Sequence, residues 1–174
     1  HTDISELEEF MANPDKYLTQ LDPADITFSD GVLKSTTYDD IYFSVENGLA
    51  EARHVFCDGT GLSDALQTST HLVIAETGFG TGLNLMAVLA EQARLKTSYQ
   101  IDYISFEARP LSVYNIEQAH RPFPEIAGFS EHMRAQWPRR WPAVHSFQME
   151  GGSVSVQLYY GRAETILPNV NFYA

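Results

Sequence analysis

The sequence has one cysteine, Cys57, among 174 residues, so no disulfide can form within a single chain. Its six histidines are scattered, and no group of Cys and His has zinc-site spacing, so we expect no metal. No hydrophobic run approaches the roughly 20 residues of a membrane-spanning helix, and no basic and then apolar segment at the start indicates a signal peptide. These absences predict a soluble, cytoplasmic protein without a membrane partner.

Positive charge is also scarce. The chain carries 23 acidic and 11 basic side chains, which gives a formal net charge of −12. Residues 1–70 hold a net −11 of this charge, whereas residues 71–174 are nearly neutral at −1. Proteins that bind nucleic acids usually present a positive surface, so an RNA partner would have to meet a local patch, most plausibly in residues 71–174.

Turn and strand patterns divide the chain into residues 1–68 and residues 69–174. The first part predicts an N-terminal helix and an antiparallel β appendage over residues 26–56. Asp30-Gly31 suits a hairpin turn, and a second turn at residues 46–48 leads into a last predicted strand that ends at Phe56. Much of this appendage is acidic.

Residues 69–174 predict an open parallel sheet. Two nearly continuous hydrophobic stretches, 71–77 and 101–107, are typical of buried parallel strands, and a helical pattern at 83–95 separates them. This order implies an α/β fold with right-handed crossover connections. Further on, we expect helices and a hairpin at 110–118 (with Pro110 in the first turn), 124–136 and 146–160.

A glycine-rich loop follows the first of these strands, with the sequence Glu76-Thr-Gly-Phe-Gly-Thr-Gly-Leu-Asn84. In doubly wound sheets, ligands bind at the carboxyl ends of the strands, and glycines let the backbone approach them closely. A dinucleotide fingerprint needs Gly or Ala where Leu83 stands, and no Gly-Lys-Ser/Thr is present, which disfavours NAD or FAD and excludes a P-loop. An acid two residues before Gly-x-Gly-x-Gly instead resembles the first motif of class I S-adenosylmethionine (SAM) methyltransferases.

We therefore predict a SAM site on this loop and on Glu107, which ends the second strand. A carboxylate at that position can accept hydrogen bonds from both ribose hydroxyls. Glu76 has two interpretations, since it can lie near the cationic groups of SAM or only stabilise the N-terminus of the following helix. The expected cofactor-binding residues are Glu76, Gly78, Phe79, Gly80, Thr81, Gly82, Asn84 and Glu107.

Longer strings resemble, in order and spacing, the methyltransferase domain of the bacterial bifunctional MnmC family. They are Asp39-Asp-Ile-Tyr-Phe-Ser44, Asn47-Gly-Leu-Ala-Glu51, His54-Val-Phe56, Ala75–Asn84 and Ile104-Ser-Phe-Glu107. The resemblance implies SAM-dependent methylation of the amine of 5-aminomethyl(-2-thio)uridine at the tRNA wobble position. Two alternatives stay open: a methyltransferase for a small molecule, which the acidic charge favours, and a non-catalytic remnant that binds SAM.

Besides Asp64-Ala65-Leu66, which stands where the family resemblance implies a basic or aromatic residue, the sequence departs from this family at two places that bear on the site. The resemblance implies that an acid in a Leu-Asp-Gly-Phe motif after the fourth strand orients the amine, and this sequence stops at Ala174 as that strand begins. We therefore expect a class I, Rossmann-like sheet whose C-terminal part is missing, and no activity from the chain alone. Where the family usually has Gly-Asp, this sequence has Gly161-Arg162, so Glu164 or backbone would have to meet the adenine amino group.

Three residues of the appendage, Asp39, Asp40 and Tyr42, are the expected catalytic contacts. They could reach the mouth of the site and hold or deprotonate the amine. The alternative interpretation is that they are polar residues of a β-bulge or turn and alternating residues of a strand.

The segment from Trp137 to Trp141 is the one cluster that combines aromatic and basic residues. Such a cluster can stack on bases and hold phosphate, or it can anchor a loop on the core. We expect tRNA contact through Arg134, Trp137, Arg139 and Arg140. Since the family is often fused to an FAD-dependent oxidase domain, the resemblance also implies such a domain or partner.

Overall fold

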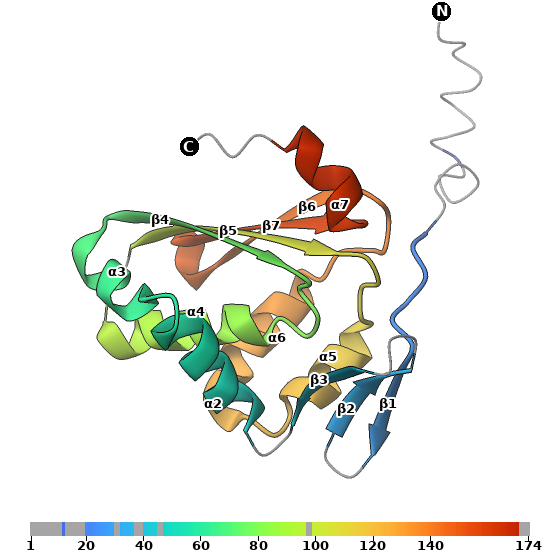
Figure 1. The fold of residues 1–174 in the computed structure, drawn as a ribbon, viewed down its shortest axis with the longest axis horizontal. Helices are drawn as coiled ribbons and strands as arrows, with labels where there is room; N and C mark the ends of the chain where they lie inside the picture. The colour runs from blue at the N-terminus through green and yellow to red at the C-terminus, as the bar shows by residue number, and fades with distance from the viewer. Residues whose placement is uncertain are drawn as a thin grey trace, which may run out of the picture.

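A computed structural model of the chain (Figure 1) describes residues 12, 20–29, 32–36, 40–44, 47–96 and 99–170. The helix predicted at the N-terminus lies outside these residues, and so does Asp39. The described part contains a larger sheet with strand order β4-β5-β7-β6 and a smaller sheet with order β1-β2-β3.

The larger sheet consists of β4 (His71–Thr77), β5 (Gln100–Glu107), β6 (Val144–Met149) and β7 (Val154–Tyr160). β4, β5 and β7 are parallel, and β6 pairs with β7 as an antiparallel hairpin. This is the α/β arrangement that the sequence predicts, including the hairpin. The parallel order brings the carboxyl ends of β4, β5 and β7 to the same edge of the sheet.

Helices α4 (Leu83–Leu95), α5 (Val113–His120) and α6 (Ala127–Ala135) lie on one side of this sheet, and the short α7 (Ala163–Ile166) lies on the other (Figure 1). Single 3-10 turns occur at Pro124–Ile126, Glu150–Gly152 and Leu167–Asn169. Helix α4 buries Leu85, Met86, Val88 and Leu89 completely. Each such side chain stabilises the fold by about 1.5–3 kcal/mol, so α4 is a main element of the core.

Helix α5 begins later than predicted. Pro110 precedes the helix instead of lying in its first turn, and Ser112 is the N-cap. The Ser112 Oγ accepts a hydrogen bond from the Asn115 N–H at 3.1 Å. A serine cap satisfies an otherwise unpaired N–H of the first turn, and this explains why the helix starts at Val113.

The smaller sheet is antiparallel and contains β1 (Ile26–Ser29), β2 (Val32–Ser35) and β3 (Asp40–Ser44). Ser29 lies opposite Val32, so the hairpin predicted at Asp30-Gly31 is confirmed by the strands on both sides of it. Between β2 and β3 the register shifts: Ile41 opposes Lys34 and Phe43 opposes Leu33. Tyr42 is therefore the extra residue of a β-bulge.

The strand predicted to end at Phe56 is wrong. The segment forms α2 (Gly48–Ala52) and then a π-helix, η2 (Arg53–Asp58), which is followed by α3 (Leu62–Thr68). The short alternation of apolar and polar residues around Val55 fits a strand, but Leu49, Ala52 and Cys57 are buried in the same hydrophobic cluster as α4. Packing against α4 favours the helical conformation. The predicted division after residue 68 stays a prediction.

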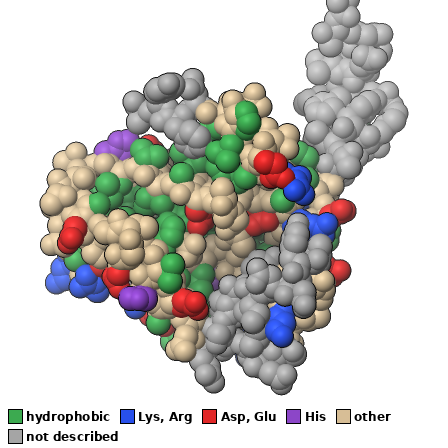
Figure 2. All heavy atoms as spheres, in the orientation of Figure 1, with side chains coloured by type: hydrophobic (Ala, Val, Ile, Leu, Met, Phe, Trp, Pro, Cys, Tyr) green, Lys and Arg blue, Asp and Glu red, His purple; other side chains and the backbone are tan. Residues whose placement is uncertain are grey.

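The described surface carries charges of both signs, and Figure 2 shows them dispersed over one face, on which the described Lys and Arg side chains form only small groups. In the part of the chain that the structure describes, no helix has the length and hydrophobicity needed to span a membrane. Among the same residues, no three His, Cys, Asp or Glu side chains are grouped so that they could hold a metal ion.

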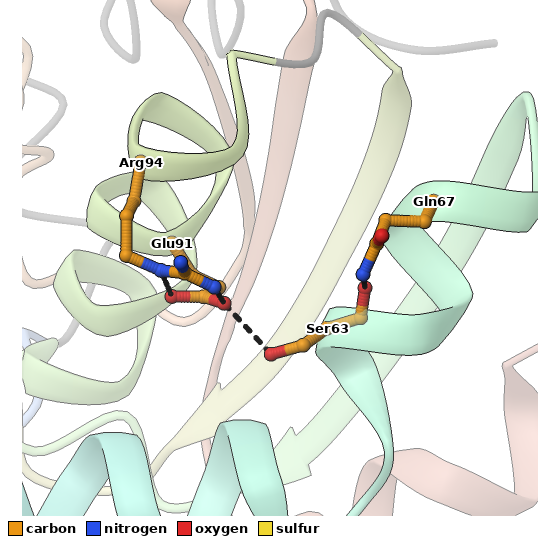
Figure 3. A network of polar contacts seen from close by, with 4 residues as sticks. All are labelled: Ser63, Gln67, Glu91 and Arg94. Carbon is orange, nitrogen blue, oxygen red and sulfur yellow. Dashed lines mark hydrogen bonds and ion pairs between the residues drawn. The ribbon is translucent and has the colours of Figure 1, made fainter.

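A polar network joins α3 to α4 (Figure 3). The Ser63 Oγ donates to the Glu91 Oε1 at 2.7 Å, and the Arg94 guanidinium donates to both Glu91 oxygens at 2.8 and 2.6 Å. Gln67 donates its side-chain amide to the Ser63 carbonyl at 3.0 Å. The hydrogen bonds from Arg94 and Ser63 lower the pKa of the buried Glu91 carboxyl to about 2. The network therefore holds a charged carboxylate between two helices.

Candidate cofactor site

The loop between β4 and α4 lies at the carboxyl ends of β4 and β5. The backbone N–H groups of Gly78 and Phe79 donate to the Phe106 carbonyl at 2.8 and 3.1 Å. Gly78, Gly80 and Gly82 have φ angles of 82°, 56° and 77°, in the left-handed region that glycine adopts without steric cost. A Cβ on Gly78 would meet no atom within 4 Å, so the space beside this residue is open to a ligand.

Glu107, at the end of β5, faces this loop. Its Oε2 accepts the Gly80 N–H at 2.8 Å, and its Oε1 accepts the Arg109 N–H at 2.7 Å. A carboxylate has about four acceptor positions, so each oxygen can accept a further hydrogen bond. Glu107 is half-buried and lines a cleft beside the loop. It can therefore hold the loop and accept hydroxyl groups of a ligand at the same time.

This cleft has a volume of about 220 Å³. Its lining consists of Gly78, Phe106, Glu107, Ala108, Arg162, Ala163 and Glu164. At the rim, the exposed Arg162 guanidinium pairs with the Glu164 carboxylate. A hydrogen bond from its own backbone, together with Arg162, lowers the pKa of Glu164. The cleft thus presents carboxylates from β5 and α7 to anything bound over the glycine loop.

Glu76 lies near the carboxyl end of β4 and contacts Asn84 in the first turn of α4. Asn84 donates to its Oε2 at 2.9 Å, and the Ser105 hydroxyl donates to its Oε1 at 3.0 Å. Burial raises the pKa of the Glu76 carboxyl, and these two hydrogen bonds act in the opposite direction. Glu76 and Asn84 therefore hold each other in place, whether or not they also touch a ligand.

Two other residues of the predicted set, Phe79 and Thr81, have buried side chains. The Phe79 ring packs against Trp137 with a centroid distance of 5.6 Å, and a Cβ on Gly82 would come within 2.7 Å of it. Phe79 therefore supports the loop from the core side. The assignment of Phe79 and Thr81 as cofactor contacts stays a prediction, and their backbones are the groups that the loop offers.

Sequence reasoning missed two buried side chains near this loop. His120 is buried, its Nδ1 lies 2.8 Å from the Ser130 Oγ, and burial lowers its pKa to about 4, so the ring is neutral at pH 7. Tyr160 is buried at the end of β7, where burial and then the nearby Glu107 raise its pKa. No motif marks His120, whereas the alternating pattern of β7 could have indicated that Tyr160 points into the core.

Two of the three predicted catalytic residues, Asp40 and Tyr42, belong to strand β3 of the smaller sheet. Asp39 lies outside the described residues, as do the side chains of Asp40 and Tyr42, whose backbones form part of β3. The β-bulge that the sequence offered as an alternative is present at Tyr42. The catalytic role of the three residues stays a prediction.

Of the four residues expected to touch tRNA, Trp137 and Arg134 are engaged within the fold, and Arg140 donates from Nη1 to the Leu21 carbonyl at 2.9 Å. Trp137 donates its indole N–H to the Leu111 carbonyl at 3.0 Å, and it contacts Phe79. This is the anchoring role that the sequence left open. Arg134 pairs with Glu117 at 3.2 Å. Arg139 and Arg140 form no ion pair with any described residue.

No family model matches the chain. Two curated relatives, from Azoarcus sp. (strain BH72) and Thiobacillus denitrificans (strain ATCC 25259 / T1), are both named tRNA 5-methylaminomethyl-2-thiouridine biosynthesis bifunctional protein MnmC. Each is 38% identical to this chain, over 143 and 152 residues, or 81% and 85% of the chain. The chain spans 22% and 24% of the length of these relatives.

Among solved structures, the crystal structure of MNMC2 from Aquifex aeolicus matches with a TM-score of 0.65 at 17% sequence identity. The match covers 97% of this chain and 59% of that chain. At this identity the likeness concerns the fold, and it confirms the predicted α/β fold class. Together with the curated relatives, the similarity shows that the chain is homologous to a segment of the MnmC proteins.

Proposed function

We propose that this chain is part of the domain that carries out the methyl-transfer step of MnmC, from SAM to the amine of 5-aminomethyl(-2-thio)uridine at the wobble position of tRNA. The observation that carries the proposal is 38% identity to MnmC over more than four fifths of the chain. The relatives' name refers to a tRNA base with a methylaminomethyl group, which is the product of methylating an aminomethyl group. The cofactor-site geometry supports the same chemistry.

The residues of the cleft fit SAM. The open space at Gly78 admits a ligand against the loop backbone, and Glu107 keeps acceptor capacity for two ribose hydroxyls. Glu164 is an acceptor at the cleft rim for the adenine amino group, since Arg162 cannot accept a hydrogen bond. When bound, SAM supplies an electrophilic methyl group on a cationic sulfur, and Glu76 adds negative charge on the same side of the sheet.

The accepting amine must be neutral, because its lone pair forms the new bond to carbon. An alkylammonium is mostly protonated at pH 7, so a base or a dry pocket has to favour the free amine, and alignment supplies much of the rate. We keep Asp39, Asp40 and Tyr42 as the proposed amine contacts. The bulge at Tyr42 supports this, since β-bulges redirect side chains and are frequent beside active sites.

The proposed partners are tRNA and an oxidase. The relatives are called bifunctional, and this chain corresponds to less than a quarter of their length, so most of each relative is available for the second activity. We propose that an FAD-dependent oxidase domain or partner supplies the aminomethyl substrate, as the family resemblance implies. A tRNA substrate would also place the enzyme in the cytoplasm, the compartment that the sequence predicts.

The net charge of −12 favours one competing function, methylation of a small molecule, because an acidic protein repels the RNA backbone. The test uses the full encoded protein, because the sequence predicts no activity from this chain alone. It supplies SAM with a labelled methyl group and compares tRNA carrying 5-aminomethyluridine with the free nucleoside. We expect label in the tRNA. Label in the nucleoside alone would favour the small-molecule enzyme, and binding of SAM without transfer to either would favour a non-catalytic protein.

A further inference from the structure

A second cleft, of about 330 Å³, lies near the glycine loop. It is lined by Gln20, Leu111, Ser112, Val113, Trp137, Pro138, Arg139 and Arg140, none of which lines the cofactor cleft. The ring of Trp137 forms part of its wall and packs on Phe79, which belongs to the glycine loop. One pair of aromatic rings therefore connects the second cleft to the cofactor loop.

Two arginines give this cleft a positive charge that no described carboxylate neutralises. Arg139 is exposed, and its guanidinium lies 5.4 Å from the centroid of the Trp141 ring. Arg140 is half-buried and donates one hydrogen bond, from Nη1 to the Leu21 carbonyl at 2.9 Å, which leaves its charge unpaired. By contrast, Arg94, Arg134 and Arg162 each pair with a carboxylate.

The start of helix α5 adds backbone donors to the same cleft. Within the cap, the N–H of Asn115 bonds to the Ser112 Oγ and the N–H of Ile116 bonds to the Ser112 carbonyl. Among the described residues, the N–H groups of Val113 and Tyr114 have no acceptor, as is usual in a first helical turn. The partial positive charge of the helix N-terminus thus adds to that of the arginines.

Exposed apolar surface borders these donors. Val113, which lines the cleft, is 42% exposed, and Tyr114, the next residue along α5, is 67% exposed. Proteins bind single-stranded nucleic acids by stacking a base on an aromatic ring and holding the phosphate with cationic side chains, and an exposed Tyr114 next to Val113 of this arginine-lined cleft offers both groups. In a chain with a net charge of −12, such a local positive cleft favours an anionic partner over a cationic one.

We propose that this cleft binds a phosphodiester group of the RNA substrate close to the nucleotide that is methylated. Arg139, Arg140 and the start of α5 hold the phosphate, and Tyr114 contacts a neighbouring base. The inference rests on the proposed function for its substrate. The Trp137–Phe79 contact keeps the phosphate near the cofactor loop, so binding here would position the wobble nucleotide and add affinity.

The test compares the full encoded wild-type protein with its Arg139→Glu variant and with Arg121→Glu, a matched charge reversal of another exposed arginine at the opposite end of α5. Fluorescence anisotropy measures the affinity for an anticodon stem-loop that carries 5-aminomethyluridine, over a range of salt concentrations. We expect Arg139→Glu to weaken binding about tenfold and to reduce the salt slope by about 0.7–1. S-adenosylhomocysteine binding, measured by calorimetry, should stay at the wild-type value in both variants.

A second variant, Arg140→Gln, removes the positive charge but keeps an amide that can donate to the Leu21 carbonyl. A loss of RNA affinity similar to that of Arg139→Glu would therefore reflect the missing charge and not a broken contact with Leu21. Unchanged affinity and salt slope in Arg139→Glu, with methylation of the stem-loop by the wild type, would overturn the phosphate site and leave the proposed function standing. Equal losses in Arg139→Glu and Arg121→Glu would also overturn it. A loss of stem-loop affinity in Arg139→Glu and Arg140→Gln but not in Arg121→Glu, with no methylation of the stem-loop by the wild type, would support the phosphate site and overturn the proposed function. No binding of the stem-loop by the wild type would overturn both.

Discussion

The backbone N–H of Gly80 donates to the Glu107 Oε2 at 2.8 Å, so one carboxylate fastens the loop after β4 to the end of β5. The other oxygen of Glu107 accepts the Arg109 N–H, which fixes the plane of the carboxylate. In this orientation the remaining acceptor positions are available to the cleft that Glu107 lines. Loop shape and the proposed ligand recognition therefore depend on the same side chain.

Replacing this carboxylate should weaken cofactor binding. In Glu107→Gln, one acceptor becomes an amide N–H₂ that faces either the Gly80 or the Arg109 N–H, and the charge is lost. Loss of a charged hydrogen bond costs about 1.5–3 kcal/mol, or roughly tenfold or more in affinity. Calorimetry with S-adenosylhomocysteine measures this, with Glu131→Gln on the exposed side of α6 as control. Wild-type affinity in Glu107→Gln would remove Glu107 from the site.

A methyl group at Gly82 should disturb the loop from the core side. At the φ of 77° that Gly82 adopts, any other residue loses about 1–2 kcal/mol of folding free energy to steric strain. The new Cβ would also lie 2.7 Å from the Phe79 ring. We expect Gly82→Ala to lower the thermal midpoint and the affinity for S-adenosylhomocysteine together. The control is Gly128→Ala in α6, where a Cβ meets nothing within 4 Å and alanine favours the helix by up to about 1 kcal/mol. Equal midpoints for the two variants would contradict the prediction.

The elements around the cofactor loop could be predicted from the sequence because their signals are local. The hydrophobic stretch of β4, the glycine spacing and the helical pattern of α4 are all contained in residues 71–95. The helices at residues 48–58 could not be predicted in this way, since a short alternation fits a strand and only contact with α4 decides otherwise. The inward direction of Phe79 also depends on a distant residue, Trp137. The second cleft, too, requires residues from three separate segments.

The Glu91 carboxyl should make stability depend on pH in the acidic range. Its pKa in the folded chain is about 2, below the ordinary value of 4.5, chiefly because Arg94 and also Ser63 donate hydrogen bonds to it (Figure 3). A group with a lowered folded pKa contributes stability above its unfolded pKa and loses it as the pH falls toward the folded pKa. The contribution is therefore complete above about pH 4.5 and declines toward about pH 2.

The variant Glu91→Gln should be less stable than wild type near neutral pH, and the difference should shrink as the pH falls through this window. Urea unfolding at successive pH values measures it, with Glu131→Gln, an exposed carboxylate on α6, as the matched control. The control should follow the wild-type curve. A constant difference between Glu91→Gln and wild type at every pH would show that the network contributes packing only, without the charged hydrogen bonds.

The exchange of the family's usual acid for Arg162 should shift adenine recognition to Glu164. Both side chains are exposed, at 70% and 62%, so solvent screens their ion pair and it adds little to stability, and variants of either should fold as the wild type does. If Glu164 accepts the adenine amino group, wild-type protein should prefer S-adenosylhomocysteine to the analogue in which hypoxanthine replaces adenine. Glu164→Gln should lose most of that preference, because its amide can also donate to the hypoxanthine oxygen. Arg162→Ala should keep or increase the preference, because it frees the carboxylate from its partner.

Competition calorimetry with the two nucleosides measures both effects, and an unchanged preference in Glu164→Gln would move adenine recognition to the backbone of the cleft.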